Sequence, residues 1–436
     1  MDDKMKQQTQ NETQKPTKYR PEVVLSTEEN PCWGSLRQRV ATEIDPAELA
    51  IDWDNMQRFD EWRSTRKNDR EYRGEEAHRA IEEHKRNFLL TREEQSAAGY
   101  SIRDVALNQS FSSTIPQLRF MGPQKASTPQ QRGVPIHQGS PQQNAALVAR
   151  ALRLMGAATV GFVELHDDST RKLIYGKEVK DGKPIVFEDA EVGYEAEDKL
   201  VLPNAARWVI VYCIPMSGLG LAQAPSQLSR ATTMQAYTRL FTIYNQLHEF
   251  IRGLGYHSYG ATIMNGFGVY PAFAVLGGLG ELSRMDVVIT PEYGPMVRLA
   301  AMATDLPLAA TRPISFGVAQ YCKSCRICTS SCIGKSISGD PEPGWEPKGP
   351  WSNPGHRTYY RESMRCRDIF YKTGSNCGIC LASCPFSEPD QEKYRAFLAE
   401  IQGASPPAPV RQPNRRTPGD WWKNTDGPEL DIRTRF

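Results

Sequence analysis

Cysteine spacing constrains this chain more than any other feature of its sequence. Eight of the ten cysteines lie between Cys322 and Cys384. The first run has the spacing C-x2-C-x2-C-x3-C and comprises Cys322, Cys325, Cys328 and Cys332. The second run ends in C-x2-C-x3-C-P and comprises Cys366, Cys377, Cys380 and Cys384. Thiolates that share an inorganic centre fix the loops between them, so these runs predict a local fold built around such centres.

The spacing is typical of bacterial ferredoxins with two [4Fe–4S] clusters, in which the fourth cysteine of each run ligates the other cluster. This crossing predicts one cluster held by Cys322, Cys325, Cys328 and Cys384. It predicts a second cluster held by Cys332, Cys366, Cys377 and Cys380. Zinc sites usually pair two C-x2-C elements, and disulfides are expected in secreted chains, so both alternatives fit less well. Ile333 replaces the usual proline, which changes a turn but removes no ligand.

Length and charge exclude some classes of function. A chain of 436 residues can bury one large core or two to three smaller ones, which is enough for an enzyme. Its 53 Lys and Arg residues against 51 Asp and Glu residues give a net charge of +2, so no nucleic-acid partner is predicted. The longest apolar runs are shorter than the ~20 residues that a membrane-spanning helix needs.

The first residues of the chain are polar and lack the apolar core of a signal peptide. The one Arg-Arg pair, Arg415-Arg416, lies near the other end. We therefore expect a cytoplasmic protein from the sequence as given. The alternative is export by a twin-arginine leader missing from this sequence, and in that case a membrane anchor protein would be a partner.

Composition divides the chain into four parts. Residues 1–143 are expected to be disordered at first, then helical with dense mixed charge, and to cover the core. A loop rich in Pro, Gln and Gly ends this region, and the more apolar residues 144–310 predict an α+β domain. Residues 311–400 contain the cysteine runs, and residues 401–436 form a Pro-rich tail.

The middle region shows no known cofactor motif. A helix and then a strand are predicted after residue 144, a buried strand at 207–216, and a long amphipathic helix at 226–254. Gly218–Gln223 fails the dinucleotide fingerprint at its last position. His257 has the His-x-x-Gly part of a cobalamin-ligating loop without its Asp, so we interpret it as closing a helix and not as a cobalt ligand.

From Leu247 to Cys384 the sequence resembles the cobalamin- and iron–sulfur-dependent reductive dehalogenases. The matching stretches are LHEFIRGLGYHSYG, AVLGGLGELSR, ITPEYGPMVRLAAMATDLPLA, PISFGVAQYCKSCRICTSSC and NCGICLASCP. The resemblance implies a nitroreductase-like cobalamin-binding core followed by a ferredoxin-like domain. It also implies base-off cobalamin with no protein ligand to cobalt, an organohalide substrate, and an external electron donor such as reduced ferredoxin or flavodoxin. A homodimer is left open.

By position, the resemblance implies Tyr237 as the proton donor, Arg298 as its helper and Asn265 on the halide side of the substrate. Reduction of a carbon–halogen bond takes two electrons and one proton. A phenol with a reference pKa near 10 is a weak acid at neutral pH, and a nearby guanidinium favours its phenolate form. Tyr244 is the competing tyrosine.

Structural interpretations of these residues stay open. Tyr237 fits a core tyrosine on an amphipathic helix, and Arg298 fits a salt bridge with Glu292 or Asp305. Several aromatic residues are candidate walls of an apolar pocket over the corrin: Trp33, Trp53, Phe120, Trp345 and Trp351. Two other functions are kept as alternatives: an epoxyqueuosine reductase-like cobalamin and iron–sulfur enzyme, and a non-catalytic iron–sulfur electron carrier.

Overall fold

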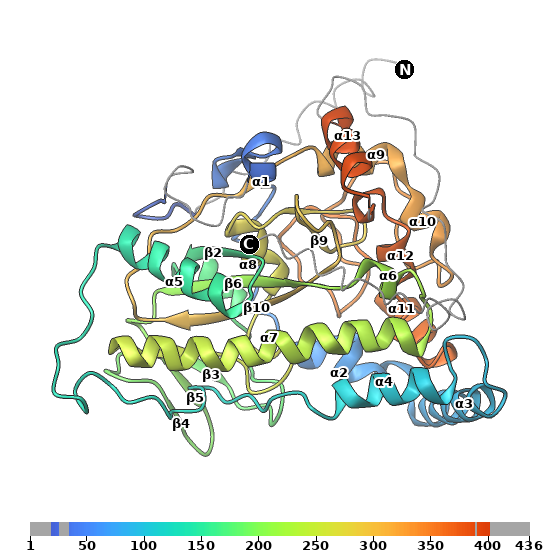
Figure 1. Ribbon diagram of the computed structural model, residues 1–436, viewed down its shortest axis with the longest axis horizontal. Helices are drawn as coiled ribbons and strands as arrows, with labels where there is room; N and C mark the ends of the chain where they lie inside the picture. The colour runs from blue at the N-terminus through green and yellow to red at the C-terminus, as the bar shows by residue number, and fades with distance from the viewer. Residues whose placement is uncertain (1–18, 26–34, 389, 402–436) are drawn as a thin grey trace, which may run out of the picture.

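A four-stranded antiparallel sheet lies at the centre of the protein, in the strand order β2-β6-β10-β7 (Figure 1). The computed structural model describes residues 19–25, 35–388 and 390–401. The strands of the central sheet are β2 (Thr159–Glu164), β6 (Trp208–Pro215), β10 (Val297–Thr304) and β7 (Ser258–Tyr259). β6 is apolar along nearly its whole length and is buried, as the sequence predicts for residues 207–216.

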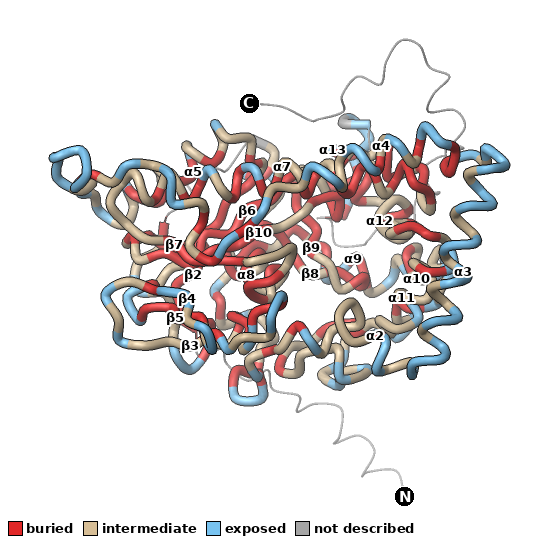
Figure 2. The backbone as a smooth tube through the Cα atoms, turned by 90° about the horizontal axis from the view of Figure 1, so that it is seen from below, coloured by how far each residue is buried: buried red, intermediate tan, exposed pale blue. Residues whose placement is uncertain are grey.

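Two helices cover the two faces of this sheet. Figure 2 shows the long helix α7 (Gln227–Leu254) on one side and α8 (Tyr270–Leu276) on the other. Tyr212 of β6 donates a hydrogen bond from its hydroxyl to the carbonyl of Leu240 in α7, at 2.8 Å. On the α8 side the backbone approaches so closely that a Cβ on Gly161 would lie 2.1 Å from the carbonyl oxygen of Gly277. Glycine is therefore required at that point of β2.

Local sequence signals explain where α7 begins and ends. Ser226 and Ser229 form a reciprocal capping box at its start, which satisfies free backbone N–H groups. Gly255 ends the helix with φ of +97°, a left-handed conformation that glycine adopts without a Cβ clash. The structure thus confirms the long amphipathic helix predicted at 226–254.

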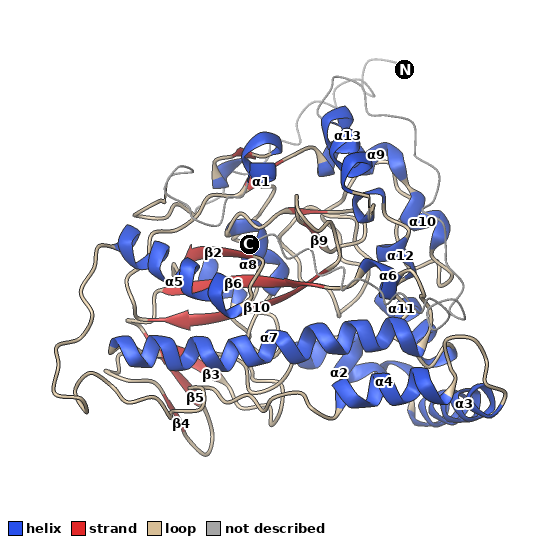
Figure 3. Ribbon diagram, in the orientation of Figure 1, coloured by secondary structure: helices blue, strands red, loops and turns tan. Residues whose placement is uncertain are grey.

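Helices and short strands surround the central layer (Figure 3). The remaining helices before the cysteine runs are α1 (Ser35–Val40), α2 (Thr65–Arg73), α3 (Glu75–Glu94), α4 (Ile102–Ser112), α5 (Pro141–Met155) and α6 (Gly218–Leu221). Short 3-10 helices lie at Pro46–Glu48, Glu61–Arg63, Thr170–Leu173 and Pro385–Ser387. The remaining strands are β1 (Thr42–Glu43), β3 (Ile185–Glu188), β4 (Tyr194–Glu195), β5 (Leu200–Pro203), β8 (Glu281–Leu282), β9 (Val288–Ile289) and β11 (Ile314–Ser315).

Short helices carry five of the eight clustered cysteines, and part of this segment packs around a second hydrophobic core. They are α9 (Val318–Cys325), α10 (Ile327–Ser331), α11 (Ser363–Lys372) and α12 (Ile379–Ala382), and α13 (Gln391–Ile401) follows them. This core combines apolar side chains such as Phe316, Tyr321 and Phe386 with the buried thiols of Cys322 and Cys384. The cysteine-bearing segment therefore has an apolar interior of its own.

The N-terminal region contributes to the main core as well as covering it. Trp53 and Phe120 are buried in the same hydrophobic core as the central strands. α3 has no buried residue, in agreement with the exposed charged helices predicted there. Most of the predicted disordered start lies outside the described residues, as do Trp33 and the tail after residue 401. No helix within the described part of the chain combines the length and apolar character needed to cross a membrane.

Candidate active site

Three predicted site residues from separate elements come together beside α7. Tyr237 lies on α7 and is 7% exposed. The guanidinium carbon of Arg298 lies 5.2 Å from the centre of the Tyr237 ring. Asn265, in the loop before α8, donates a hydrogen bond from Nδ2 to the Tyr237 hydroxyl at 3.3 Å. The phenol therefore has a cation beside its ring and an amide donor at its oxygen.

Strand register explains why Arg298 faces α7. In β10, Arg298 pairs with Ile214 of β6, and Ala300 pairs with Tyr212. Directly paired residues point to the same face of a sheet, and Tyr212 reaches α7, so Arg298 also points to α7. Arg298 also donates to the Thr233 hydroxyl at 3.4 Å. Thr233 precedes Tyr237 by one helical turn, so the guanidinium spans one turn of the helix.

The structure does not support the proposed salt bridges of Arg298. Glu292 pairs with Arg37, whose Nε lies 2.8 Å from Glu292 Oε1. Asp305 pairs with His257, which lies just after the end of α7. The Nδ1 atom of His257 lies 2.8 Å from Asp305 Oδ2. The expectation that Glu292 or Asp305 pairs with Arg298 is therefore wrong, because each carboxylate faces a different partner.

Tyr244 has a structural environment. Its hydroxyl donates to the Ala301 carbonyl at 3.1 Å and accepts a hydrogen bond from the Ala261 backbone N–H at 2.8 Å. Burial raises the pKa of Tyr244 above the usual tyrosine value, and the side chain is 1% exposed. This phenol connects α7 to β10 and to the loop after β7, and it is a weaker acid than a solvated tyrosine.

The four thiols predicted for the first cluster line one small cavity. They are Cys322, Cys325, Cys328 and Cys384. Burial raises the pKa of Cys328 to about 12, with additional repulsion from the Cys322, Cys380 and Cys325 thiolates. Converging buried thiols lose their protons readily only when a cation takes up the charge, so this donor set fits an iron–sulfur cluster.

The other four thiols form a second neighbouring group. Burial raises the pKa of Cys380 to about 12, Arg361 opposes this rise, and the Cys377, Cys366 and Cys332 thiolates add to it. The Ser336 backbone N–H approaches Cys332 Sγ at 3.3 Å. The grouping agrees with the crossed ligand sets predicted from the spacing. Within the part of the chain described, no group of His, Cys, Asp or Glu residues could hold a single metal ion. A cubane cluster differs from such a site because its thiolates bind four separate iron atoms.

Two buried charged side chains hold the first cysteine run in place. Arg284 is 1% exposed, donates from Nε to the Cys322 carbonyl at 2.9 Å, and lies 3.8 Å from the centre of the Tyr359 ring. The Glu281 carboxylate accepts from backbone N–H groups at the start of α9, including that of Val318 at 3.2 Å. Both side chains therefore satisfy backbone groups around the helix that carries Cys322.

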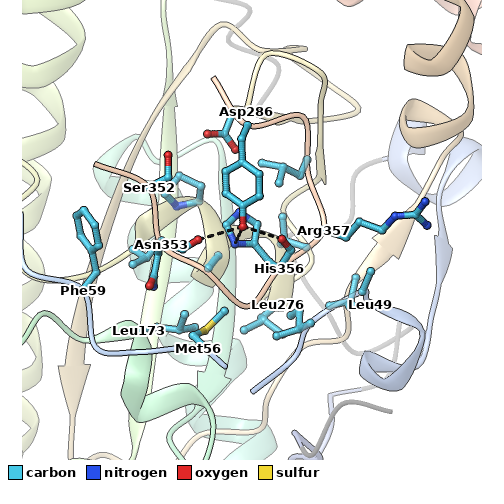
Figure 4. Close-up of a pocket in the computed structure, with 18 of the residues that line it drawn as sticks. Leu49, Met56, Phe59, Leu173, Leu276, Asp286, Ser352, Asn353, His356 and Arg357 are labelled. Carbon is cyan, nitrogen blue, oxygen red and sulfur yellow. Dashed lines mark hydrogen bonds between the residues drawn. The ribbon is translucent and has the colours of Figure 1, made fainter. Parts of the chain in front are cut away.

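A cavity of about 310 Å³ lies between the N-terminal segment, α8 and the segment that joins the two cysteine runs (Figure 4). Its apolar wall includes Trp53, Met56, Phe59, Leu173, Tyr175, Val269, Ala272, Val275, Leu276 and Trp351. Two of the predicted pocket aromatics, Trp53 and Trp351, thus line it. Phe120 belongs to the hydrophobic core, and Trp345 does not line this cavity.

Polar side chains also line this cavity, among them Asp286, His356, Tyr360 and Arg361. The Tyr360 hydroxyl lies 2.8 Å from the His356 carbonyl oxygen, and burial lowers the pKa of His356. Arg361 Nε is buried without a hydrogen-bond partner in the structure described. Arg361 therefore joins the cavity wall to the second cysteine group.

Three residues of these sites were not predicted from the sequence: Thr233, Arg284 and Arg361. Arg361 precedes Cys366 by five residues, so a cation close to a cysteine run was an available signal. Thr233 precedes Tyr237 by four residues and was open to the same reasoning from helical spacing. Arg284 lies 38 positions from Cys322, the residue it binds, and only the fold brings the two together.

A family model and several known proteins identify similarity to reductive dehalogenases. A family model described as reductive dehalogenase subunit matches residues 37–308. The tetrachloroethene reductive dehalogenase of Sulfurospirillum multivorans is 35% identical over 254 residues, which cover 55% of this chain and 49% of that protein. The trichloroethene reductive dehalogenase of Dehalococcoides mccartyi is 28% identical over 353 residues, which cover 68% of this chain and 60% of that protein. The chain thus spans about half to three fifths of these relatives.

A solved structure and a more distant relative complete the comparison. The catabolic reductive dehalogenase NpRdhA matches with a TM-score of 0.59 at 21% identity, over 83% of this chain and 46% of that chain. This likeness shows a shared fold. Epoxyqueuosine reductase of Listeria monocytogenes is 27% identical over 143 residues, which cover 30% of this chain and 35% of that protein.

Proposed function

The chain belongs to the reductive dehalogenase family, and we propose that it removes halide from an organohalide substrate with cobalamin and two [4Fe–4S] clusters. The net reaction converts a carbon–halogen bond, two electrons and one proton into a carbon–hydrogen bond and a halide ion. The observation that carries the proposal is the convergence of Tyr237, Arg298 and Asn265 in a chain that also groups eight cysteines into two sets.

We place the corrinoid in the cavity lined by Trp53, Val275 and Trp351. The cavity borders the second cysteine group at Arg361, and Val269 in its wall belongs to the loop that carries Asn265. The apolar wall suits part of a large macrocycle. The cavity of about 310 Å³ is smaller than a whole corrinoid, and Tyr237, Arg298 and Asn265 do not line it, so binding would have to widen the cavity toward these residues. When bound, cobalamin would supply the cobalt centre for reduction of the carbon–halogen bond, in a nitroreductase-like part of the chain spanning residues 144–310.

The protein's own groups around the reaction have separate roles. The Tyr237 hydroxyl is the proton donor, and the Asn265 amide fixes the direction of that hydroxyl. Arg298 stabilises negative charge on the phenolate after proton transfer, and its positive charge attracts the leaving halide. Burial of this group keeps bulk water away from the proton, since Tyr237 is 7% exposed.

Electrons reach this site through the ferredoxin-like residues 311–400. The first cluster would be held by Cys322, Cys325, Cys328 and Cys384, and the second by Cys332, Cys366, Cys377 and Cys380. Helix α10, which carries Cys328, contacts helix α12, which carries Cys380, and this contact supports neighbouring clusters. This proximity suits transfer of single electrons between two clusters, and an external reduced ferredoxin or flavodoxin would supply them.

Anaerobic reconstitution tests the proposal against its two alternatives. The purified chain should hold about eight iron and eight sulfide ions and one corrinoid, and it should release halide from chlorinated or brominated substrates. Iron without corrinoid would favour the electron carrier. Corrinoid and iron with activity on an epoxyqueuosine-containing tRNA, and no halide release, would favour the epoxyqueuosine reductase.

A further inference from the structure

Ile333 is an exposed apolar side chain next to a predicted cluster ligand. It follows Cys332 directly, replaces the proline of the ferredoxin run, and is 52% exposed. It belongs to neither hydrophobic core among the described residues. Burial within the chain therefore does not explain an isoleucine at this position.

The turn that carries Ile333 lies directly on helix α11. A Cβ on Gly334 would lie 2.8 Å from Cγ1 of Ile369 and 3.0 Å from the Arg365 carbonyl oxygen, so the turn and the helix are in close contact. Lys335, on the turn, is exposed. Arg365 and Lys372 of α11 are also exposed, and their spacing of seven residues places them on one helical face. Ile333, Lys335, Arg365 and Lys372 form what we call the entry patch.

The entry patch contains one paired carboxylate on the same face of α11 as its cations. Asp368 follows Arg365 by three residues and precedes Lys372 by four, and it forms an ion pair with Arg73. On the other face of α11, Arg367 donates to Asp69 at 3.0 Å. No ion pair involves Lys335, Arg365 or Lys372 in the described part of the chain. A half-buried carboxylate, Glu362, precedes α11. The patch thus has an apolar centre and three cations, none of which forms an ion pair with a described residue.

The entry patch is also the surface next to the second cysteine group. Ile333 follows Cys332, and Arg365 precedes Cys366, so two ligands of the second set are chain neighbours of patch residues. The thiols of Cys322, Cys328 and Cys384 in the first set are buried more deeply. An electron that enters through this surface would meet the second set first. This set also borders the cavity at Arg361, so in this route the second set passes electrons to the corrinoid and exchanges them with the first set.

We propose that the entry patch docks an acidic ferredoxin-type electron carrier. The proposal rests on the proposed function in that the second cysteine set must hold a cluster. One electron passes from the reduced iron–sulfur centre of the carrier to the oxidised cluster, and no bond forms or breaks. Electron-transfer partners use small, transient interfaces, and local charge orients their encounter. With a net charge of only +2 on the whole chain, a local cationic patch is needed for such orientation.

Stopped-flow mixing of the reconstituted protein with a reduced acidic [4Fe–4S] ferredoxin tests the proposal. Lys335→Glu/Arg365→Glu should lower the second-order rate of cluster reduction at least tenfold at low ionic strength, and the difference should shrink as salt screens the charges. Ile333→Ser should weaken docking while leaving the salt dependence unchanged, because it removes no charge.

Two controls separate docking from other effects. Arg150→Glu/Lys180→Glu makes the same change in net charge at exposed positions outside the entry patch, and it should keep the wild-type rate. Arg150 belongs to α5, which lies at the other end of the molecule from α11 (Figure 1). Reduced methyl viologen, a small donor that needs no docking, should reduce the clusters of all variants equally. Wild-type rates with ferredoxin in the patch variant, or equal slowing in the remote variant, would overturn the proposal. Failure of methyl viologen to reduce any cluster in the wild type would instead overturn the proposed function on which it rests.

Discussion

The guanidinium of Arg298 lies against the ring of Tyr237, with its central carbon 5.2 Å from the ring centre. These residues come from β10 and α7, and the strand register that turns Arg298 toward the helix fixes their contact. The contact places a positive charge beside the phenol that we propose as the proton donor.

Removal of the Arg298 charge should impair turnover more than a change in its shape. Arg298→Met should lower the rate of halide release by about 10² or more, because charge stabilisation at the reacting groups is lost. Arg298→Lys keeps the charge and loses the planar fork that reaches Thr233, so the decrease in the rate of halide release should be smaller. Halide release driven by reduced methyl viologen measures both. Equal activities of the two variants would argue against a charge effect.

Filling the cavity should displace the corrinoid. Ala272 of α8 lines the cavity, and Ala272→Trp would add an indole there. Cobalt retained after reconstitution and gel filtration should fall at least tenfold, because overpacking leaves no room for the ligand. Iron content should not change. Leu154→Trp is the control, since Leu154 is 89% exposed. Full cobalt retention by Ala272→Trp would show that the corrinoid binds elsewhere.

Arg361 should raise the reduction potential of the second cluster. Its charge lies beside Cys366, Cys380 and Cys332, and it favours the more negative, reduced state of a cluster held there. In Arg361→Met, the ratio of reduced to oxidised second cluster at a fixed potential should fall about tenfold, equivalent to about 59 mV for one electron. A redox titration followed by electron paramagnetic resonance measures this ratio.

Arg365→Met is the matched control for the Arg361 variant. Arg365 is exposed next to Cys366, so solvent screens its charge and its removal should shift the potential less. Equal shifts in both variants, or none in Arg361→Met, would contradict the tuning role.

His248 should make the protein less stable in mild acid. It is 2% exposed, its Nδ1 lies 2.7 Å from the Ser258 hydroxyl oxygen, and burial lowers its pKa to about 3. The unfolded chain, with a histidine pKa near 6.5, binds this proton first as the pH falls. The free energy of unfolding should therefore drop by about 1 to 2 kcal/mol between pH 7 and pH 5 through this group.

Denaturant unfolding of the wild type and His248→Gln at both pH values measures that contribution. The variant should lose less stability between pH 7 and pH 5, because glutamine does not titrate. An identical pH dependence in both proteins would exclude His248 as a source of acid sensitivity.

Features that depend on residues close together in the sequence could be predicted from sequence patterns. The run of apolar residues in β6 and the heptad-like spacing in α7 reflect burial, and the structure confirms both elements. Cysteine spacing grouped Cys322, Cys325, Cys328 and Cys384 together, and the structure brings these four thiols to one cavity, while the clusters themselves stay a prediction. Recognition of the family blocks pointed to Tyr237, Arg298 and Asn265, and the structure brings these three side chains together, although their catalytic roles remain predictions.

Contacts across long separations could not be predicted in this way. Glu292 was a plausible partner of Arg298 because it is near in sequence, yet it pairs with Arg37, which is 255 positions away. The cavity likewise combines Trp53 with Trp351, and no local periodicity relates such distant segments. These features depend on how the N-terminal region and the segment between the cysteine runs pack onto α8.

Tyr244→Phe provides a matched control for the central residue. Its hydroxyl bonds Ala301 and Ala261, so the variant should lose stability, since buried backbone groups are left unsatisfied at a cost of about 1–3 kcal/mol. Halide release per folded molecule should nevertheless stay near the wild-type value.

The rate of halide release by Tyr237→Phe, reconstituted anaerobically and driven by reduced methyl viologen, tests the central claim most directly. Phenylalanine keeps the ring beside Arg298 and removes only the hydroxyl that Asn265 contacts. Iron and cobalt contents should be unchanged, and the rate should fall by about 10²–10⁴, the usual contribution of general acid catalysis. A fully loaded Tyr237→Phe protein that releases halide at the wild-type rate would contradict the central claim.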